Sequence, residues 1–235
     1  MKFKYLVGEE TDPYRNLATE QEILNNVAHD IAVLYLWQND NTIVVGRNQD
    51  VYCECNVNNF LNEGGRIARR RSGGGAVYHD LGNLNFSIIC DISKKESCEY
   101  QKLLIKVLRQ FGIKADYNGR NDIMVCGKKC SGNSAYQSDE AICQHGTLLI
   151  ATDIGRMVSF LTPKKSKLAR NHVTSIESRV INLSEINHDI NVESMIQAFI
   201  QITEACELEY TPNRNKIEQI AEFYKSREWV YGGMK

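Results

Sequence analysis

Short runs of alternating or continuous hydrophobic residues recur along the chain and predict β-strands. Polar or glycine-containing segments separate them, as expected for turns and loops. The polar residues 38–41, between two β-rich runs, predict a hairpin turn. The predicted strands cover residues 3–7, 31–37, 42–45, 66–69, 76–79, 84–89, 113–117, 123–125, 129–134 and 141–150.

Hydrophobic residues spaced three and four apart predict helices between these strand groups. The first begins at Asp12-Pro13, with aspartate as the N-cap and proline in the first turn. Leu17 and Leu24 fall on one face of it, and Glu20 and Glu22 are expected to point outward. Further helices are predicted at residues 57–62, 97–111, 153–161, 191–206 and 213–224.

Strands therefore come in groups, with helices between the groups rather than after every strand. This order favours the α+β class, with mixed or antiparallel sheets flanked by helices. The chain shows no internal repeat, and residues 164–170 form one basic, loop-like interruption. We expect residues 1–235 to form a single domain.

Composition narrows the class of protein further. The 235 residues carry a formal net charge of -1, with 43% hydrophobic and 24% charged residues, as in soluble globular proteins. This balance argues against a protein that coats nucleic acid. No apolar run approaches the ~18 residues that span a bilayer, and no secretory leader opens the chain. We therefore expect a cytoplasmic protein with no membrane partner.

Eight cysteines are present, but no CxxC pair occurs among them. A structural zinc site is therefore not expected. In a cytoplasmic protein the thiols are expected to be reduced, without disulfides.

A run of three arginines, one serine and three glycines occupies residues 69–75. Along a strand Arg69 and Arg71 share one face and Arg70 takes the other. Buried arginines usually meet an anion, and glycines let backbone N–H groups approach a ligand closely. We interpret the run as a phosphate or carboxylate cradle rather than a plain tight turn. It is neither a P-loop nor a dinucleotide fingerprint, because the residues that define those motifs are missing.

Two further segments carry candidate chemistry. Lys128 and Lys129 start a strand-like run, so one projects inward and the other to solvent. Asp122, just upstream, offers a carboxylate that either pairs with the inward lysine or holds a metal ion. His145 is either a strand histidine or part of the same site. Cys130 is better explained as a small core residue than as a nucleophile.

Taken in order, these segments resemble the lipoate–protein ligases, a branch of the biotin/lipoate ligase superfamily whose catalytic domain is class II synthetase-like. The longest match runs Arg-Arg-Ser-Gly-Gly-Gly-Ala-Val-Tyr-His-Asp-Leu-Gly-Asn over residues 70–83, and the likeness extends from the first helix to Trp229. The other matching segments are residues 36–39, 44–49, 121–122, 127–132, 145–149 and 175–183.

The resemblance implies an enzyme that converts lipoate and Mg-ATP to lipoyl-AMP and pyrophosphate. The lipoyl group then passes to a lysine of a lipoyl domain, in 2-oxoacid dehydrogenase E2 subunits or the glycine-cleavage H protein. By analogy Lys129 contacts the lipoate carboxyl and the α-phosphate, while Lys128 stays outside. Asp122 would either ligate Mg²⁺ or orient Lys129.

The resemblance also implies a set of lipoate- and ATP-binding residues. The close passage of the ligand would then explain the glycines, and an apolar slot for lipoate is expected beside Val45 and Val77. The implied binding residues are Arg70, Ser72, Gly73, Gly74, Gly75, Ala76, Val77, Tyr78, His79, Asn83, Asn121, Asp122 and His145.

Two departures from the family pattern bear on function. Many members carry a smaller C-terminal accessory domain, for which this chain is expected to have no room, so it either acts alone or uses a separate accessory chain. The same fold also hosts ATP-independent lipoyl and octanoyl amidotransferases with a catalytic cysteine. Residues 121–122 contain no cysteine, and residues 161–164 lack the Pro-Cys pair of the octanoyltransferases. The ligase is therefore favoured.

Overall fold

A large mixed sheet and a small three-stranded sheet form the framework of the protein in the computed structural model, which describes residues 2–162, 179–209 and 211–232. The basic stretch at 164–170 and residues 175–178 of the matching segment lie outside the described residues. The large sheet has the strand order β11-β1-β2-β6-β10-β9-β8-β7, and the small one β4-β3-β5. The predicted α+β class is confirmed.

The strands of the two sheets have the following bounds. In the large sheet they are β1 (Lys2–Val7), β2 (Ile31–Trp37), β6 (Asn83–Asp91), β7 (Ala115–Tyr117), β8 (Asp122–Val125), β9 (Lys128–Gln137), β10 (Ala141–Leu149) and β11 (Cys206–Glu207). In the small sheet they are β3 (Thr42–Val45), β4 (Arg66–Arg69) and β5 (Val77–His79).

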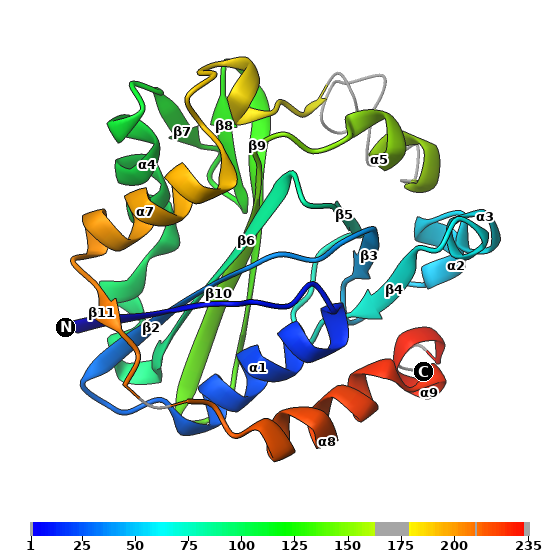
Figure 1. Ribbon diagram of the computed structural model, residues 1–235, viewed down its shortest axis with the longest axis horizontal. Coiled ribbons are helices and arrows are strands. Elements are labelled where there is room, and N and C mark those ends of the chain that lie inside the picture. Colours follow the sequence, from blue (N-terminus) through cyan, green and yellow to red (C-terminus); the bar gives the residue numbers. More distant parts are fainter. Residues whose placement is uncertain (1, 163–178, 210, 233–235) are drawn as a thin grey trace.

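Helices pack on both faces of the large sheet and around the small one. The described helices are α1 (Pro13–Asn26), α2 (Val51–Glu54), α3 (Val57–Asn62), α4 (Tyr100–Gln110), α5 (Ile154–Phe160), α7 (Val192–Thr203), α8 (Arg214–Lys225) and α9 (Arg227–Tyr231), with 3-10 turns at Ile92–Cys98 and Leu183–Glu185. Helices α4 and α7 pack on one face, where Leu104 and Phe199 bury against Phe86. Helices α1 and α8 pack on the other, where Leu17 meets Tyr35 (Figure 1). A third core lies between the small sheet and α2, α3, α5 and α9.

Helix α1 begins as the sequence predicts but buries more of its surface than expected. The Asp12 side chain accepts hydrogen bonds from the backbone N–H groups of Tyr14 and Arg15, so its N-cap role is confirmed. Glu20 and Glu22, expected to point outward, are buried at 1% and 4% exposure. That expectation was wrong: the Glu20 carboxylate lies on the sheet side of α1, where it contacts Ser87 of β6 and His145 of β10, and α8 packs along the same helix.

The predicted hairpin between residues 31–37 and 42–45 does not form. β2 pairs with β1 and β6 in the large sheet, whereas β3 pairs with β4 in parallel and β5 in antiparallel. Asn41 adopts a φ of 40° in the connection. The four polar residues therefore carry the chain from one sheet to the other, which local turn chemistry does not distinguish from a hairpin.

Other differences concern the ends of elements. The helix predicted over 191–206 ends at Thr203, because Glu204 takes a left-handed φ of 50° as its cap, and Cys206 joins β11. Strand β9 extends to Gln137, beyond the predicted 129–134. The short helices α2 and α9 were not predicted from the sequence.

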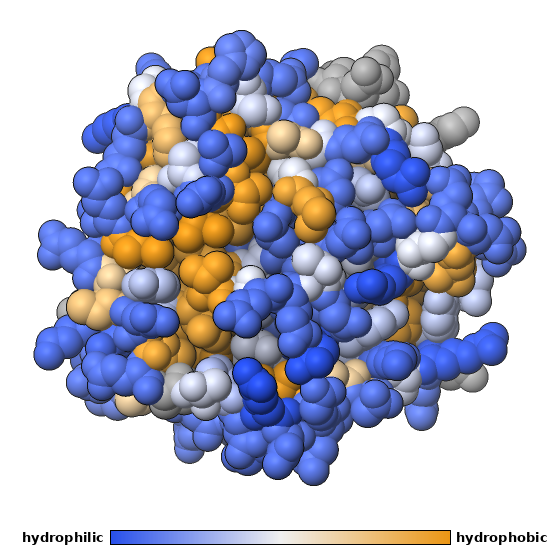
Figure 2. All heavy atoms as spheres, viewed as in Figure 1, coloured by the Kyte–Doolittle hydropathy of each residue, from blue (hydrophilic) through white to orange (hydrophobic). Residues whose placement is uncertain are grey.

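The surface on the face viewed in Figure 1 is mostly hydrophilic. Figure 2 shows a band of hydrophobic residues on that face, between the positions of α7 and α1. Over the described part of the chain, none of the helices combines the length and the apolar character needed to cross a membrane.

Candidate active site

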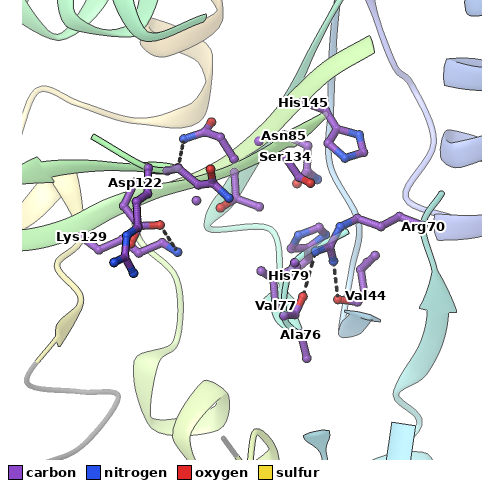
Figure 3. A pocket seen from close by; sticks show the side chains of 18 of the residues that line it. Val44, Arg70, Ala76, Val77, His79, Asn85, Asp122, Lys129, Ser134 and His145 are labelled. Atoms are coloured by element: carbon purple, nitrogen blue, oxygen red, sulfur yellow. Dashed lines mark hydrogen bonds and ion pairs between the residues drawn. The ribbon is translucent and has the colours of Figure 1, made fainter. Parts of the chain in front are cut away.

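A cavity of about 350 Å³ opens between the glycine-rich run and strands β8, β9 and β10. In Figure 3, Lys129 and Asp122 lie on one side of it, and Arg70, His79 and Val77 on the other. The lining residues are Leu17, Trp37, Val44, Arg70, Gly74, Gly75, Ala76, Val77, His79, Asn85, Asn118, Arg120, Asn121, Asp122, Lys129, Gly132, Asn133, Ser134, His145, Gly146, Thr147 and Arg179.

The glycine-rich run folds tightly onto its neighbours. Gly74 has a φ of +97°, and a Cβ there would lie 2.8 Å from the Arg70 guanidinium. A Cβ on Gly46 would lie 2.2 Å from the Gly74 carbonyl oxygen. These two glycines are thus explained by backbone conformation and by the packing of the loop on Gly46. The expected explanation, close passage of a ligand, is not needed for either of them.

Arg70 is the one arginine of the run that lines the described cavity. Its Nε donates to Ser72 Oγ at 3.0 Å, and its terminal nitrogens donate to the carbonyls of Val44, Gly73 and Gly75. Burial lowers the pKa of Arg70 to about 10, which leaves it charged at neutral pH. The guanidinium is therefore held rigidly at the cavity wall.

Arg69 and Arg71 lie on the opposite side of β4, as strand alternation predicts, and serve a different purpose. Arg69 is 2% exposed and donates to backbone carbonyls instead of an anion. The Arg71 guanidinium lies 5.6 to 5.9 Å from three aromatic ring centroids of α8 and α9 and donates to Tyr224 Oη. The carbonyls that Arg69 contacts belong to Gly46, Arg47, Gln49, Trp229 and Val230.

The β8–β9 hairpin places the lysine candidate. Cys126 and Gly127 form its two-residue turn, with φ values of 50° and 74°, as type I′ hairpins require. Lys128 is exposed, whereas Lys129 turns to the cavity, where its Nζ lies 2.7 Å from Asp122 Oδ1. The prediction that the two lysines face opposite sides is confirmed.

Asp122 makes a second ion pair on its other oxygen. Arg179 lies 2.9 Å from Asp122 Oδ2, so each carboxylate oxygen faces one cation. Mg²⁺ prefers carboxylates together with water and phosphate oxygens. Asp122 is the one carboxylate among the described lining residues, and its geometry fits the orienting role. A magnesium ligand at this position stays a prediction.

His79 and Asn85 present buried hydrogen-bond donors. Asn39 Nδ2 lies 3.1 Å from His79 Nδ1, which leaves the proton of the neutral ring on Nε2. Burial, reinforced by the nearby Arg70 charge, lowers the pKa of His79 to about 3, so the ring is neutral. Neither His79 Nε2 nor Asn85 Nδ2 has a hydrogen-bond partner among the described residues. Both residues line the cavity, so they suit an anionic or carbonyl acceptor.

The apolar part of the cavity is made by Leu17, Trp37, Val44 and Val77. Val45, which was expected to line the slot, is fully buried in the third core instead. Because side chains alternate along a strand, Val44 and not Val45 faces the cavity from β3.

Most of the sequence-predicted site residues meet around this one cavity. Four do not line it: the side chain of Tyr78 packs in the third core, while Ser72, Gly73 and Asn83 support residues that do. Several lining residues were not predicted as site residues from the sequence. Some of them stand inside the matched segments: Trp37, Val44, Gly132, Gly146, Thr147 and Arg179. The others lie outside these segments: Leu17, Asn85, Asn118, Arg120, Asn133 and Ser134.

The cysteines stay out of the described cavity lining. Cys130 is fully buried, and burial raises the pKa of its thiol to about 12. Cys143 is likewise fully buried, and burial holds its pKa well above the usual value. Both thiols are therefore protonated and poor nucleophiles at neutral pH.

The structure is thus an open mixed sheet flanked by helices, with Lys129 and Arg70 on opposite sides of a partly apolar cavity. The family model described as the lipoyl protein ligase A/B catalytic domain matches residues 12–204. The chain therefore belongs to the lipoyl protein ligase A/B catalytic domain family.

Named relatives agree with the family. A lipoate-protein ligase A from Psychrobacter cryohalolentis is 38% identical over 201 residues, which cover 86% of this chain and 59% of the relative. The chain thus spans well under two thirds of that relative's length. A lipoate-protein ligase A from Bdellovibrio bacteriovorus is 36% identical, over 98% of this chain and 72% of the relative.

Solved structures show the same fold. A bi-partite lipoate protein ligase from Thermoplasma acidophilum, described with its E2 lipoyl domain, has a TM-score of 0.83 and 25% identity, and covers 100% of this chain and 98% of its own. Plasmodium falciparum LipL1 in complex with lipoate has a TM-score of 0.80 and 30% identity, over 99% and 75%. A lipoate-protein ligase A bound with ATP has a TM-score of 0.82 and 25% identity, over 100% of both chains.

Proposed function

We propose that this protein is an ATP-dependent lipoate–protein ligase. In the first step the lipoate carboxylate attacks the α-phosphorus of ATP, which gives lipoyl-AMP and releases pyrophosphate. In the second step the amine of an acceptor lysine attacks the acyl carbon, and AMP leaves. Family membership, and similar ligases whose structures contain ATP or lipoate, support this proposed function.

The arrangement of Lys129 and Arg70 on opposite walls of one cavity carries the proposal. A carboxylate and a triphosphate repel each other, and fixed cations lower that repulsion and stabilise charge that develops at the α-phosphate. The apolar wall at Trp37, Val44 and Val77 suits the hydrocarbon tail of lipoate. One cavity thus offers surfaces for both substrates.

Each supporting residue has a proposed task. Asp122 holds Lys129 in place by their 2.7 Å ion pair, so that the lysine can meet both anions. The N–H groups of His79 Nε2 and Asn85 Nδ2 donate to substrate oxygens. Mg²⁺ enters as part of the substrate Mg-ATP, where it neutralises the pyrophosphate.

The acceptors proposed from family membership are lipoyl domains of E2 subunits and the H protein. A neighbouring ligase described with an E2 lipoyl domain supports the first of these. That neighbour is also described as bi-partite, and we propose that the present chain acts as a single catalytic unit whose adenylation step is assisted by a separate accessory chain. A cytoplasmic location remains a prediction.

The direct test is to incubate the protein with lipoate, Mg-ATP and a lipoyl domain, with and without candidate accessory proteins. We expect pyrophosphate release and a lipoyl mass added to the domain. Pyrophosphate release that requires an accessory protein would support the assisted adenylation step, whereas transfer from ready-made lipoyl-AMP with no pyrophosphate release under any condition would indicate a protein that uses the adenylate without making it. Absence of both reactions, with all candidates supplied, would refute the ligase.

An ATP-independent acyl transferase is the main alternative, and the burial of Cys130 and Cys143 weighs against it. Such an enzyme would form a thioester on a cysteine. A triple variant with alanine at Cys126, Cys130 and Cys143 is expected to keep pyrophosphate release. A thioester adduct on the wild type that this variant loses, formed without ATP, would favour the transferase.

A further inference from the structure

Glu20 is a buried carboxylate next to the active site that none of the steps above uses. It sits in the middle of α1, is 1% exposed, and is absent from the described cavity lining. An ionised carboxylate is costly to bury unless donors surround it. The hydrogen-bond partners of Glu20 therefore indicate why a carboxylate is buried at this position.

One chain of hydrogen bonds runs from Glu20 to Arg70. The Glu20 Oε2 atom lies 2.8 Å from Nδ1 of His145, and Nε2 of that ring lies 2.6 Å from Ser72 Oγ. Ser72 Oγ in turn accepts from Arg70 Nε at 3.0 Å. Three contacts thus connect a core carboxylate to the guanidinium at the cavity wall.

A second chain leaves the same oxygen in another direction. Ser87 Oγ donates to Glu20 Oε2 at 2.6 Å, and Trp37 Nε1 donates to Ser87 Oγ at 3.0 Å. Trp37 lines the apolar part of the cavity. A single carboxylate oxygen therefore anchors the cationic wall and the apolar wall together.

The charge of the Glu20 carboxylate determines which atoms of the chain donate and which accept. Burial raises the pKa of Glu20, but the neighbouring His145 and the hydrogen bonds from His145 and Ser87 outweigh burial and bring the pKa below its usual value. An ionised carboxylate only accepts, so His145 Nδ1 carries a proton. Ser72 Oγ accepts from Arg70 Nε, so its own hydroxyl proton can be donated to His145 Nε2 at 2.6 Å.

A metal ion is a weaker explanation of this cluster. The possible ligand atoms of Glu20, Cys143 and His145 lie within 4.8 Å of one another. The carboxylate and the imidazole, however, already stand at the 2.8 Å of a hydrogen bond. Hydrogen bonding accounts for the geometry on its own.

We propose that Glu20 is a positioning residue of the active site, whose carboxylate fixes the Nδ1–H tautomer of His145 and holds Arg70 and Trp37 at the cavity wall. The kinetic consequence rests on the proposed ligase function. The structural consequence does not, so the two are tested separately.

The structural arm uses ¹⁵N NMR of the histidine side chains, with His145 assigned by its loss in His145→Gln. We expect the wild type to carry the His145 proton on Nδ1. Glu20→Met keeps the volume but removes the acceptor, so a mixture with the Nε2–H tautomer is expected. Glu20→Gln keeps an acceptor oxygen and should retain Nδ1–H. The matched control Glu22→Met removes another buried carboxylate of α1 and should leave the tautomer unchanged.

The kinetic arm measures pyrophosphate release. Glu20→Met is expected to raise KM for lipoate or ATP on the order of tenfold or more, with a smaller change in kcat, whereas Glu20→Gln should recover most of the loss and Glu22→Met should match the wild type.

A wild-type His145 protonated on Nε2, or a Glu20→Met variant with unchanged tautomer and KM, would overturn the proposal. The wild-type measurement alone decides the tautomer if the methionine variant does not fold. If the wild type releases no pyrophosphate even with the accessory proteins supplied, the ligase function fails while the NMR arm still decides the role of Glu20.

Discussion

Lys129 Nζ and Asp122 Oδ1 lie 2.7 Å apart across the β8–β9 hairpin, and both side chains are largely withdrawn from solvent, at 22% and 12% exposure. The pair couples the position of the proposed catalytic lysine to the register of two strands. The pair therefore fixes the orientation of the lysine amine relative to the cavity.

Lys129→Ala tests the lysine directly, and Lys128→Ala is its matched control on the adjacent, exposed position. Removing Lys129 takes away the cation proposed to stabilise the α-phosphate, so pyrophosphate release should fall by on the order of a hundredfold or more. Lys128→Ala should keep wild-type rates. Equal losses in both variants, measured with lipoate and Mg-ATP, would contradict the assignment.

Asp122→Asn separates the orienting role from metal binding. Asparagine leaves Lys129 and Arg179 without the anion between them, so kcat is expected to drop about tenfold. The dependence on Mg²⁺ concentration should stay as in the wild type. Asp116→Asn, at an exposed position on neighbouring β7, serves as the control. Activity restored to Asp122→Asn by excess Mg²⁺ would instead indicate a metal ligand.

Gly74 and Gly73 offer a matched pair for the loop. Gly74→Ala places a side chain at φ +97° and 2.8 Å from the Arg70 guanidinium, whereas a Cβ on Gly73 meets nothing within 4 Å. We expect Gly74→Ala to lower the free energy of unfolding by about 1–3 kcal/mol and to weaken substrate binding. Gly73→Ala should be nearly neutral in urea unfolding. A neutral Gly74→Ala would show that the loop relaxes freely.

His79 should make stability depend on pH. Its pKa is about 3 when folded and about 6.5 when unfolded, so the unfolded chain binds the extra proton between these values. The His79 contribution is therefore full above pH 6.5 and lost as pH falls towards 3, by up to about 1.4 kcal/mol per pH unit. Urea unfolding at several pH values should show a shallower decline for His79→Gln than for the wild type. Parallel declines would contradict a neutral His79.

Trp229 joins the arginine run to the C-terminal helices. Its Nε1 donates to the Arg69 carbonyl at 2.8 Å, and its ring lies beneath the Arg71 guanidinium. Trp229→Phe keeps a ring but loses one hydrogen bond, so the free energy of unfolding should fall by about 1 kcal/mol. Trp229→Ala should cost about 3 kcal/mol and also raise KM, because β4, which leads directly into Arg70, loses its support. Circular dichroism in urea, with pyrophosphate release, checks both. Equal costs for the two variants would mean that the ring does not matter.

Local patterns predicted much of the fold, since caps, periodicity and turn residues act within a few residues. The Asp12 N-cap and the alternation of Arg69, Arg70 and Arg71 are examples. The failures concern tertiary choices. Residues 38–41 carry the same turn chemistry whether the next strand stays in the sheet or leaves it. Glu20 is a charged residue in the middle of a helix, and the contacts that enclose it, from Ser87 of β6 and His145 of β10, come from residues distant in the sequence.

In the candidate site, too, local patterns were predicted correctly and tertiary contacts were not. Lys129, Asp122 and Arg70 were identified because charged residues in strand-like segments need partners, and the structure brings them to one cavity. Val45 was chosen over Val44 wrongly, because the phase of a four-residue strand is fixed by its neighbours and not by its own composition. The fixed geometry around His145 depends on residues from positions 20, 72 and 87, which no local motif joins.

The anchoring of Arg69 and Arg71 bears on where the boundary of the catalytic domain is drawn in proteins of this family. The matched family segment ends at residue 204, whereas the three rings around Arg71 and two of the carbonyls that Arg69 contacts come from α8 and α9, after residue 213. The unit defined by sequence likeness is thus smaller than the unit that shapes the pocket. A chimera that exchanges only the matched segment between relatives would take its cavity residues from one parent and the α8 and α9 anchors of Arg69 and Arg71 from the other.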